Sequence, residues 1–247
     1  MISLDLNLIY ARLPLDVVAF FAKTSDERVE SYPKHPLHLF PVPPTFPFLK
    51  YFTMGRYRIH DQQGLYFLTC TVVGWIDIFS RQNYRDIVLK SLTFCRKEKG
   101  LLVFAFVVMS NHLHLVLQTA PDSSFSLSDI LRDFKKYTAN NILKTIMNEP
   151  ESRRDWLLHM FEFYANFNAN NRNFQVWQQD NHPIALYSEK VIWEKINYIH
   201  NNPVRAGLVF QPEDYIYSSA LNYKTEGKEG IIEIDLLEAW WSDIGKV

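Results

Sequence analysis

The sequence has few cysteines, no long apolar run and no excess of one charge, and each absence excludes a class of protein. Its two cysteines, Cys70 and Cys95, form no recurrent disulfide framework, so we interpret them as reduced core residues of an intracellular protein. No apolar run approaches the roughly 18 residues that a membrane-spanning helix needs, so we expect no membrane partner. A basic segment of the kind that opens a signal peptide is absent as well.

The near-zero net charge hides an uneven distribution. The chain carries 26 basic and 27 acidic residues, for a formal net charge of −1. Residues 1–53 hold five of each sign, and residues 226–247 hold two basic and six acidic residues. The stretch 54–225 therefore keeps 19 basic and 16 acidic residues, a mild positive excess that permits a polyanionic partner without requiring one.

The composition is that of a globular protein. Apolar residues make up 47% and charged residues 21% of the 247 positions, which predicts a sizeable core and excludes wholesale disorder. Aromatic residues reach 15%, a content that suits core packing and also the stacking of nucleic-acid bases. The length predicts one domain with appendages.

Proline marks the first boundary. Seven of the twelve prolines fall in the first 50 residues, where they prevent a sustained helix or a central strand. We therefore expect residues 1–53 to be a poorly ordered extension, with Met54 as a possible true start. Residues 54–225 form the expected domain, and residues 226–247 an acidic tail.

Regular patterning within 54–225 predicts an α+β fold. Strands are expected at 65–73, 101–109 and 112–119, with a fourth within 175–187. Helices are expected at 83–99, at 126–147 behind the capping pair Ser126 and Asp129, and at 188–201, the last stopped by Pro203. This order predicts a ferredoxin-like fold, in which helices pack on one face of a four-stranded antiparallel sheet.

The run Ser110–Leu117 contains the sharpest chemical pattern. On a strand, His112 and His114 share one face while the intervening leucines face the core. Two imidazoles so placed can converge on a divalent cation and leave positions open for a substrate oxygen. An isolated His-x-His is equally typical of two half-exposed histidines without a metal.

A second pattern, DFKKY, lies on the helix expected at 126–147. Tyr137 follows Lys135 and Lys136, with Arg132 five residues before it in sequence and Asn141 one turn after it. A phenolic oxygen attacks phosphorus effectively when nearby cations stabilise the developing negative charge. Taken alone, the pattern also fits an amphipathic helix with a half-buried tyrosine.

Together with their surroundings, these patterns resemble a known family. Over residues 54–223 the chain resembles the single-tyrosine HUH (IS200-like) transposases, in particular the REP-associated tyrosine transposases. The resemblance rests on LYFLTCTVV at 65–73, MSNHLHL at 109–115, DFKKY at 133–137, VWQQD at 176–180, YIHNNPVRAGLV at 198–209 and YIYSS at 215–219.

The resemblance implies a specific chemistry. His112 and His114 are expected to bind Mg²⁺ or Mn²⁺, and Tyr137 to attack single-stranded DNA beside a hairpin. The expected intermediate is a 5′-phosphotyrosine that leaves a free 3′-hydroxyl. Asn141, where relatives often carry glutamine, is the expected third metal ligand. The same resemblance implies a monomer or homodimer in the bacterial cytoplasm, associated with the nucleoid when bound to DNA.

Further residues are candidates for contacting DNA. These are the basic and aromatic or amide side chains of the motifs, namely Arg132, Lys135, Lys136, Trp177, Gln178 and Arg205. Trp177 is equally expected in the core. Two other functions stay open: a domesticated sequence-specific DNA-binding protein with little turnover, and a two-histidine metal hydrolase in which Tyr137 has no role.

Overall fold

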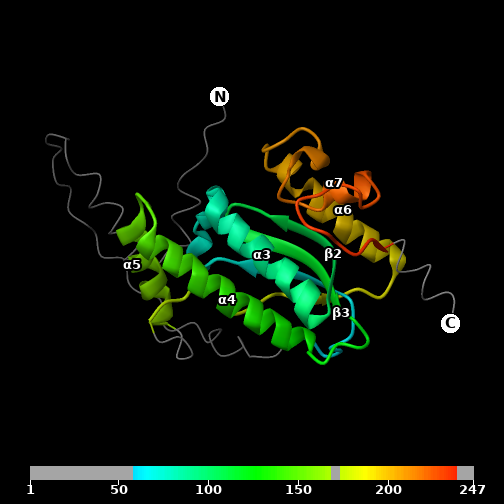
Figure 1. Cartoon of the computed structure of the whole chain (residues 1–247), viewed down its shortest axis with the longest axis horizontal. Helices are drawn as coiled ribbons and strands as arrows, with labels where there is room; N and C mark the ends of the chain where they lie inside the picture. Colours follow the sequence, from blue (N-terminus) through cyan, green and yellow to red (C-terminus); the bar gives the residue numbers. More distant parts are fainter. Residues whose placement is uncertain (1–57, 168–172, 238–247) are drawn as a thin grey trace, which may run out of the picture. The chain divides into compact units, whose positions relative to one another are not determined.

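A four-stranded antiparallel sheet forms the centre of the protein. The computed structural model describes residues 58–167 and 173–237. The strand order is β2-β3-β1-β4, so β3 and β1 are central (Figure 1). The strand bounds are Tyr66–Thr71 for β1, Leu101–Val108 for β2, His112–Thr119 for β3 and Ile184–Ala185 for β4.

Helices α3 (Gln82–Lys99) and α4 (Leu127–Asn148) lie side by side on one face of this sheet (Figure 1). Their apolar sides pack against Leu113, Leu115 and Leu117 of β3. Ser126 caps α4 as its sequence predicts, since its hydroxyl accepts a hydrogen bond from the Asp129 amide at 3.1 Å. The element order and strand order are those of the ferredoxin-like α+β fold, which is confirmed.

Helix α6 (Glu189–Arg205) covers the other face of the sheet. Ile192, Ile196 and Ile199 of α6 form a second core with Phe67 and Val116. The expectation that all helices pack on one face is therefore wrong. The physical reason lies in β2, whose eight residues LLVFAFVV are apolar at every position and so need cover on both faces.

Three other elements differ from the expected pattern. Helix α5 (Arg154–Ala165) was not expected, and β4 is only two residues long. The expected stop at Pro203 is wrong, since helix α6 continues through this residue to Arg205 at the cost of the one backbone hydrogen bond that the missing N–H would donate. Gly207, with φ of 70°, then reverses the chain. The short elements are η2 (Val73–Trp75), η3 (Ile78–Ser80), η4 (Pro212–Asp214) and α7 (Ala220–Lys224).

The acidic C-terminal tail lies partly within the described residues and contacts the sheet there. The extension 1–53 and residues 238–247 of the acidic tail lie outside the described residues. The described part of that tail contacts β2: the Asp235 amide donates to the Val103 carbonyl, and the Asp235 carboxylate accepts from the Val103 amide, both at 2.8 Å. Arg96 also forms a bidentate ion pair with Asp235. The segment around Asp235 therefore covers the edge of β2, which would otherwise be free to pair with another strand.

The cysteine interpretation is consistent with the fold. Cys70 and Cys95 are both buried free thiols. No helix in the described part of the chain is long and apolar enough to cross a membrane.

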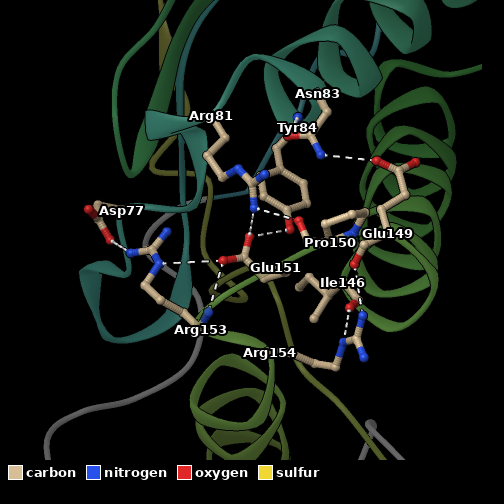
Figure 2. Close-up of polar contacts among 10 residues, drawn as sticks. All are labelled: Asp77, Arg81, Asn83, Tyr84, Ile146, Glu149, Pro150, Glu151, Arg153 and Arg154. Atoms are coloured by element: carbon tan, nitrogen blue, oxygen red, sulfur yellow. Dashed lines mark hydrogen bonds and ion pairs between the residues drawn. The ribbon is translucent and has the colours of Figure 1, made fainter.

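A buried carboxylate, Glu151, ties the loop after α4 to the beginning of α3 (Figure 2). Only 1% of its side chain is exposed, and it accepts hydrogen bonds from Arg81 at 2.7 Å and from the Tyr84 hydroxyl at 2.8 Å. The neighbouring Arg153 binds Asp77 at 2.7 Å, so the cluster also holds the loop between β1 and α3. Burial by itself raises the pKa of Glu151, but hydrogen bonds from the Arg153 amide, Tyr84 and Arg81 outweigh it and lower that pKa.

We expect Glu151→Gln to lower the free energy of unfolding at pH 7 by about 1–3 kcal/mol, because the charged acceptor of a buried cluster is lost. Since the folded-state pKa of Glu151 lies below its ordinary value of 4.5, the wild-type advantage is fully present above pH 4.5 and is lost as the pH falls through the folded pKa. Urea unfolding across pH 3–7 measures this. Glu98→Gln, on an exposed part of α3, is the matched control, and equal stability of both variants at pH 7 would contradict the assignment.

Candidate active site

The two predicted histidines lie next to each other on the α6 side of β3. Their ring centroids are 4.7 Å apart. Thr71 and Thr69 of β1 pair with His112 and His114 across the sheet. Strand alternation places the imidazoles opposite to the leucine face, as the sequence predicts. The arrangement supplies two nitrogen donors on one surface.

Both rings are oriented through Nδ1. The Nδ1 atom of His112 lies 2.7 Å from Oδ1 of Asn111, and the amide group of Asn111 donates in turn to the Trp75 carbonyl. Because an amide oxygen only accepts, Nδ1 of His112 carries the proton and Nε2 keeps its lone pair. The Thr69 hydroxyl lies 2.9 Å from Nδ1 of His114 and, unlike an amide oxygen, can either donate or accept there. No residue of the described chain forms a hydrogen bond to either Nε2 atom, so both nitrogens are available to a ligand.

Burial keeps the two imidazoles neutral. It lowers the pKa of His112, and it lowers the pKa of His114 to about 3 with smaller electrostatic contributions from His112 and Lys195. A neutral imidazole is the form that binds metal ions. Both histidines are therefore in the metal-binding form at neutral pH.

The donor set fits an open metal site and not a closed one. Among residues 58–167 and 173–237, no group of three or more His, Cys, Asp or Glu side chains could hold a metal. Two imidazoles oriented by polar neighbours are typical of a catalytic site in which water or substrate oxygens complete the coordination. Asn141, the expected third ligand, lies on α4, where its amide donates to the Tyr137 carbonyl at 2.9 Å.

Helix α6 brings a different tyrosine to the histidines. The ring centroid of Tyr198 lies 5.2 Å from that of His114 and 6.0 Å from that of Phe67. The side chain is still 36% exposed. Tyr198 thus shares a surface with the imidazoles of its own chain.

Two cations flank Tyr198. The Lys195 ammonium lies 5.9 Å from the Tyr198 ring centroid and 4.9 Å from that of Phe67. The Arg205 guanidinium lies 5.4 Å from the Tyr198 ring centroid. Neither cation forms an ion pair with any residue that the structure describes. The surface around Tyr198 is therefore positively charged and suited to a phosphate.

The predicted nucleophile, Tyr137, does not meet the histidines. It lies on α4, which packs on the leucine face, while His112 and His114 point to the opposite face. Its side chain is 53% exposed and lines a hollow between α3 and α4. The sheet thus separates Tyr137 and Asn141 from the imidazoles within one chain, and the expected meeting of these residues at one phosphodiester does not occur there.

The remaining predicted DNA-contacting residues divide into buried and exposed ones. Trp177 is buried, and its indole N–H donates to Thr138 at 3.0 Å, so it is a core residue. The Lys135 ammonium donates to the Gln178 carbonyl and to Asn181, both at 2.6 Å, and the backbone N–H of Gln178 donates to the Thr71 carbonyl.

The exposed members lie on both sides of the sheet. Arg132 forms ion pairs with Asp129 and Asp133 on its own helix. Lys136 lines the same hollow as Tyr137. Arg205 alone joins the surface that carries the histidines, through its contact with Tyr198.

The sequence analysis did not predict Tyr198 as a site residue, although the apolar pattern of α6 and β2 indicates its position. The apolar spacing of Ile192, Ile196 and Ile199 defines one side of α6, and Lys195 and Tyr198 flank that side. A helix with this apolar side needs a second apolar sheet face. The continuous apolar run of β2 indicates that such a face exists.

Comparison with known proteins identifies a family and two similar structures. The model of the IS200-like transposase family matches residues 76–179, a segment that contains His112, His114 and Tyr137 and ends before α6. This match confirms the resemblance drawn from the sequence. A search of the curated proteins finds no match.

Two solved structures are similar to the chain. One is a REP-associated tyrosine transposase bound to a REP hairpin, at 20% identity and a TM-score of 0.47, covering 72% of this chain and 90% of that one. The other is a protein of Deinococcus radiodurans R1 assigned as a transposase, at 16% identity and a TM-score of 0.35, covering 60% of this chain and 96% of that one. At these TM-scores neither structure carries an argument about this chain.

We expect the charged fraction of His112 at pH 6 to be smaller than that of an ordinary histidine, and its neutral form to carry the proton on Nδ1, because burial lowers its pKa and Asn111 accepts that proton. An ordinary histidine, with a pKa of 6.5, is mostly charged at this pH. Long-range nitrogen–proton NMR of the chelator-treated protein distinguishes the two tautomers. Asn111→Ala should shift the proton toward Nε2, whereas the exposed Asn140→Ala should not; a wild-type ring protonated on Nε2 would refute the arrangement.

Proposed function

We propose that the protein is a metal-dependent transposase that cleaves and rejoins single-stranded DNA beside a hairpin, on the premise that residues 76–179 match the model of the IS200-like transposase family. One observation carries the proposal: Tyr198 lies against His114, on the face where both imidazoles offer Nε2 and where Lys195 and Arg205 supply positive charge. The hairpin and the cellular setting, DNA in the bacterial cytoplasm, follow the resemblance drawn from the sequence.

His112 and His114 would hold Mg²⁺ or Mn²⁺ through their Nε2 atoms. The bound ion would supply a Lewis acid that polarises the scissile phosphate. Asn111 and Thr69 hold the two rings by Nδ1, so the donor atoms are fixed before DNA arrives. The protein contribution at this step is preorganisation of two neutral donors.

Tyr198 is the nucleophile in this proposal. Its phenolic oxygen attacks phosphorus, a bond from phosphorus to that oxygen forms, and the bond from phosphorus to the DNA 3′-oxygen breaks. The phenolic proton is lost and the departing 3′-oxygen gains one, which leaves a free 3′-hydroxyl and a 5′-phosphotyrosine. Lys195 and Arg205 stabilise the negative charge on the phosphate and on the attacking oxygen.

The covalent intermediate makes the reaction reversible without a nucleotide triphosphate. Attack by a 3′-hydroxyl on the phosphotyrosine restores a phosphodiester and releases Tyr198. The bond energy of the cleaved strand is thereby kept for rejoining. The role of the protein is to retain the 5′ end until a second strand end binds.

A DNA-binding protein with little turnover is the second candidate. The observation that favours it is the lack, among the described side chains, of a third His, Cys, Asp or Glu ligand beside His112 and His114. Such a protein would keep the DNA-binding surface and lose the metal. Binding and cleavage must therefore be measured separately.

We expect Tyr198→Phe and His112→Ala to reduce the covalent protein–DNA product by more than about 1,000-fold, because each removes a reacting or metal-holding group. Tyr137→Phe, on the other sheet face, removes only a phenolic oxygen and keeps the aromatic ring, so it should leave the product unchanged. The assay incubates each protein with Mn²⁺ and single-stranded oligonucleotides that carry the hairpins flanking its own gene, and resolves the products on a denaturing gel.

Each other outcome selects a different mechanism. Loss of product in Tyr137→Phe with retention in Tyr198→Phe would assign the attack to Tyr137 of a second copy, because the sheet separates it from its own histidines. Shifted but uncut DNA would favour the binding protein. Cleavage that survives both tyrosine changes would indicate a metal hydrolase.

A further inference from the structure

A hollow of about 550 Å³ lies between α3 and α4, away from the histidines. Its floor is formed by buried Cys95 and Phe134, and its rim carries Phe94 from α3 and Tyr137 from α4. We name this hollow the α3–α4 groove. Because α3 and α4 cover the leucine face of the sheet, the groove and the Tyr198 surface are on different sides of the protein.

Two aromatic rings on the rim of the α3–α4 groove are unusually exposed. Phe94 is 55% and Tyr137 53% exposed, although each contributes to the lining of an apolar hollow. The two rings come from the two facing helices, so they border the groove on both sides. Exposed aromatic rings over an apolar floor are the arrangement on which unpaired bases stack.

The charge of the groove points to an anionic ligand. Lys90 and Lys136 line it, are exposed, and form no ion pair with the residues that the structure describes. The carboxylate that lines it, Asp133, is already paired with Lys99. The groove therefore presents two uncompensated cations beside its two aromatic rings.

We propose that the α3–α4 groove binds single-stranded DNA, with Phe94 and Tyr137 stacking on bases and Lys90 and Lys136 binding phosphates. A duplex hides its base faces and would leave both rings without partners. An apolar protein surface would leave both lysines without partners, so a second copy of the chain is disfavoured as the occupant. This site is independent of metal and of Tyr198, and it gives the DFKKY motif a role in holding DNA.

The test measures binding without cleavage. The full chain, in EDTA, is titrated into a fluorescein-labelled oligothymidylate of 12 nucleotides, and anisotropy gives the Kd. Phe94→Ala and Tyr137→Ala should each raise the Kd about 5-fold to 150-fold, the range for one stacked base. Tyr187→Ala, at an exposed tyrosine outside the groove, is the control and should leave the Kd unchanged.

The lysines are tested through salt dependence. Removing one phosphate contact from a single strand lowers the slope of log Kd against log salt by about 0.7. The double variant Lys90→Gln, Lys136→Gln should therefore lower the slope by about 1.4, while Lys228→Gln, at an exposed site elsewhere, should not. Photocrosslinking with 5-iodouracil should label the peptide that contains Tyr137.

The proposal is overturned if Phe94→Ala and Tyr137→Ala bind the oligonucleotide as wild type does. It is equally overturned if a 12-base-pair duplex binds as tightly as the single strand, or if the variants lose only self-association in sedimentation while DNA binding stays intact. Because metal is absent and Tyr198 is unchanged, none of these results depends on whether the protein cleaves DNA. Thermal melting of each variant verifies that it is folded.

Discussion

Alternation along β3 is the constraint on which the rest of the structure depends. Leu113, Leu115 and Leu117 enter the core under α3 and α4, while His114 and Val116 face α6. β3 is hydrogen-bonded on both edges, to β1 and to β2, so its register is fixed twice. A shift by one residue would place imidazoles in an apolar core and leucines at the site. The fold and the chemistry of the site are therefore specified by the same eight residues.

Burial and polar support together give the histidines their character. The packing that surrounds the imidazoles lowers their pKa values and keeps them neutral. Asn111 and Thr69 then occupy one nitrogen of each ring. The Asn111 amide donates in turn to the carbonyl of Trp75. Trp75 lies in the loop between β1 and α3, which the Glu151 cluster holds through the ion pair of Arg153 with Asp77. A cluster remote from the imidazoles thus contributes to their orientation.

The sheet divides the two exposed tyrosines between two surfaces. Tyr198 shares its face with the imidazoles and two cations, whereas Tyr137 shares its face with Phe94 and two lysines. A phenol that attacks phosphorus needs positive charge close to the phosphate, but it needs only an apolar floor and exposure to stack on a base. The two faces are therefore suited to different tasks, chemistry on one and retention of a strand on the other.

The sequence by itself determined the order of the four strands and of α3, α4 and α6, the cap at Ser126 and the common face of His112 and His114, because each follows from local spacing or a local hydrogen bond. Only the tertiary structure decided that α6 covers the second face, that Trp177 is buried and that Tyr198, not Tyr137, lies beside the imidazoles. Helical periodicity shows which side of a helix is apolar. It does not show which of two apolar sheet faces that side will cover, and the position of a tyrosine relative to the histidines depends on that choice.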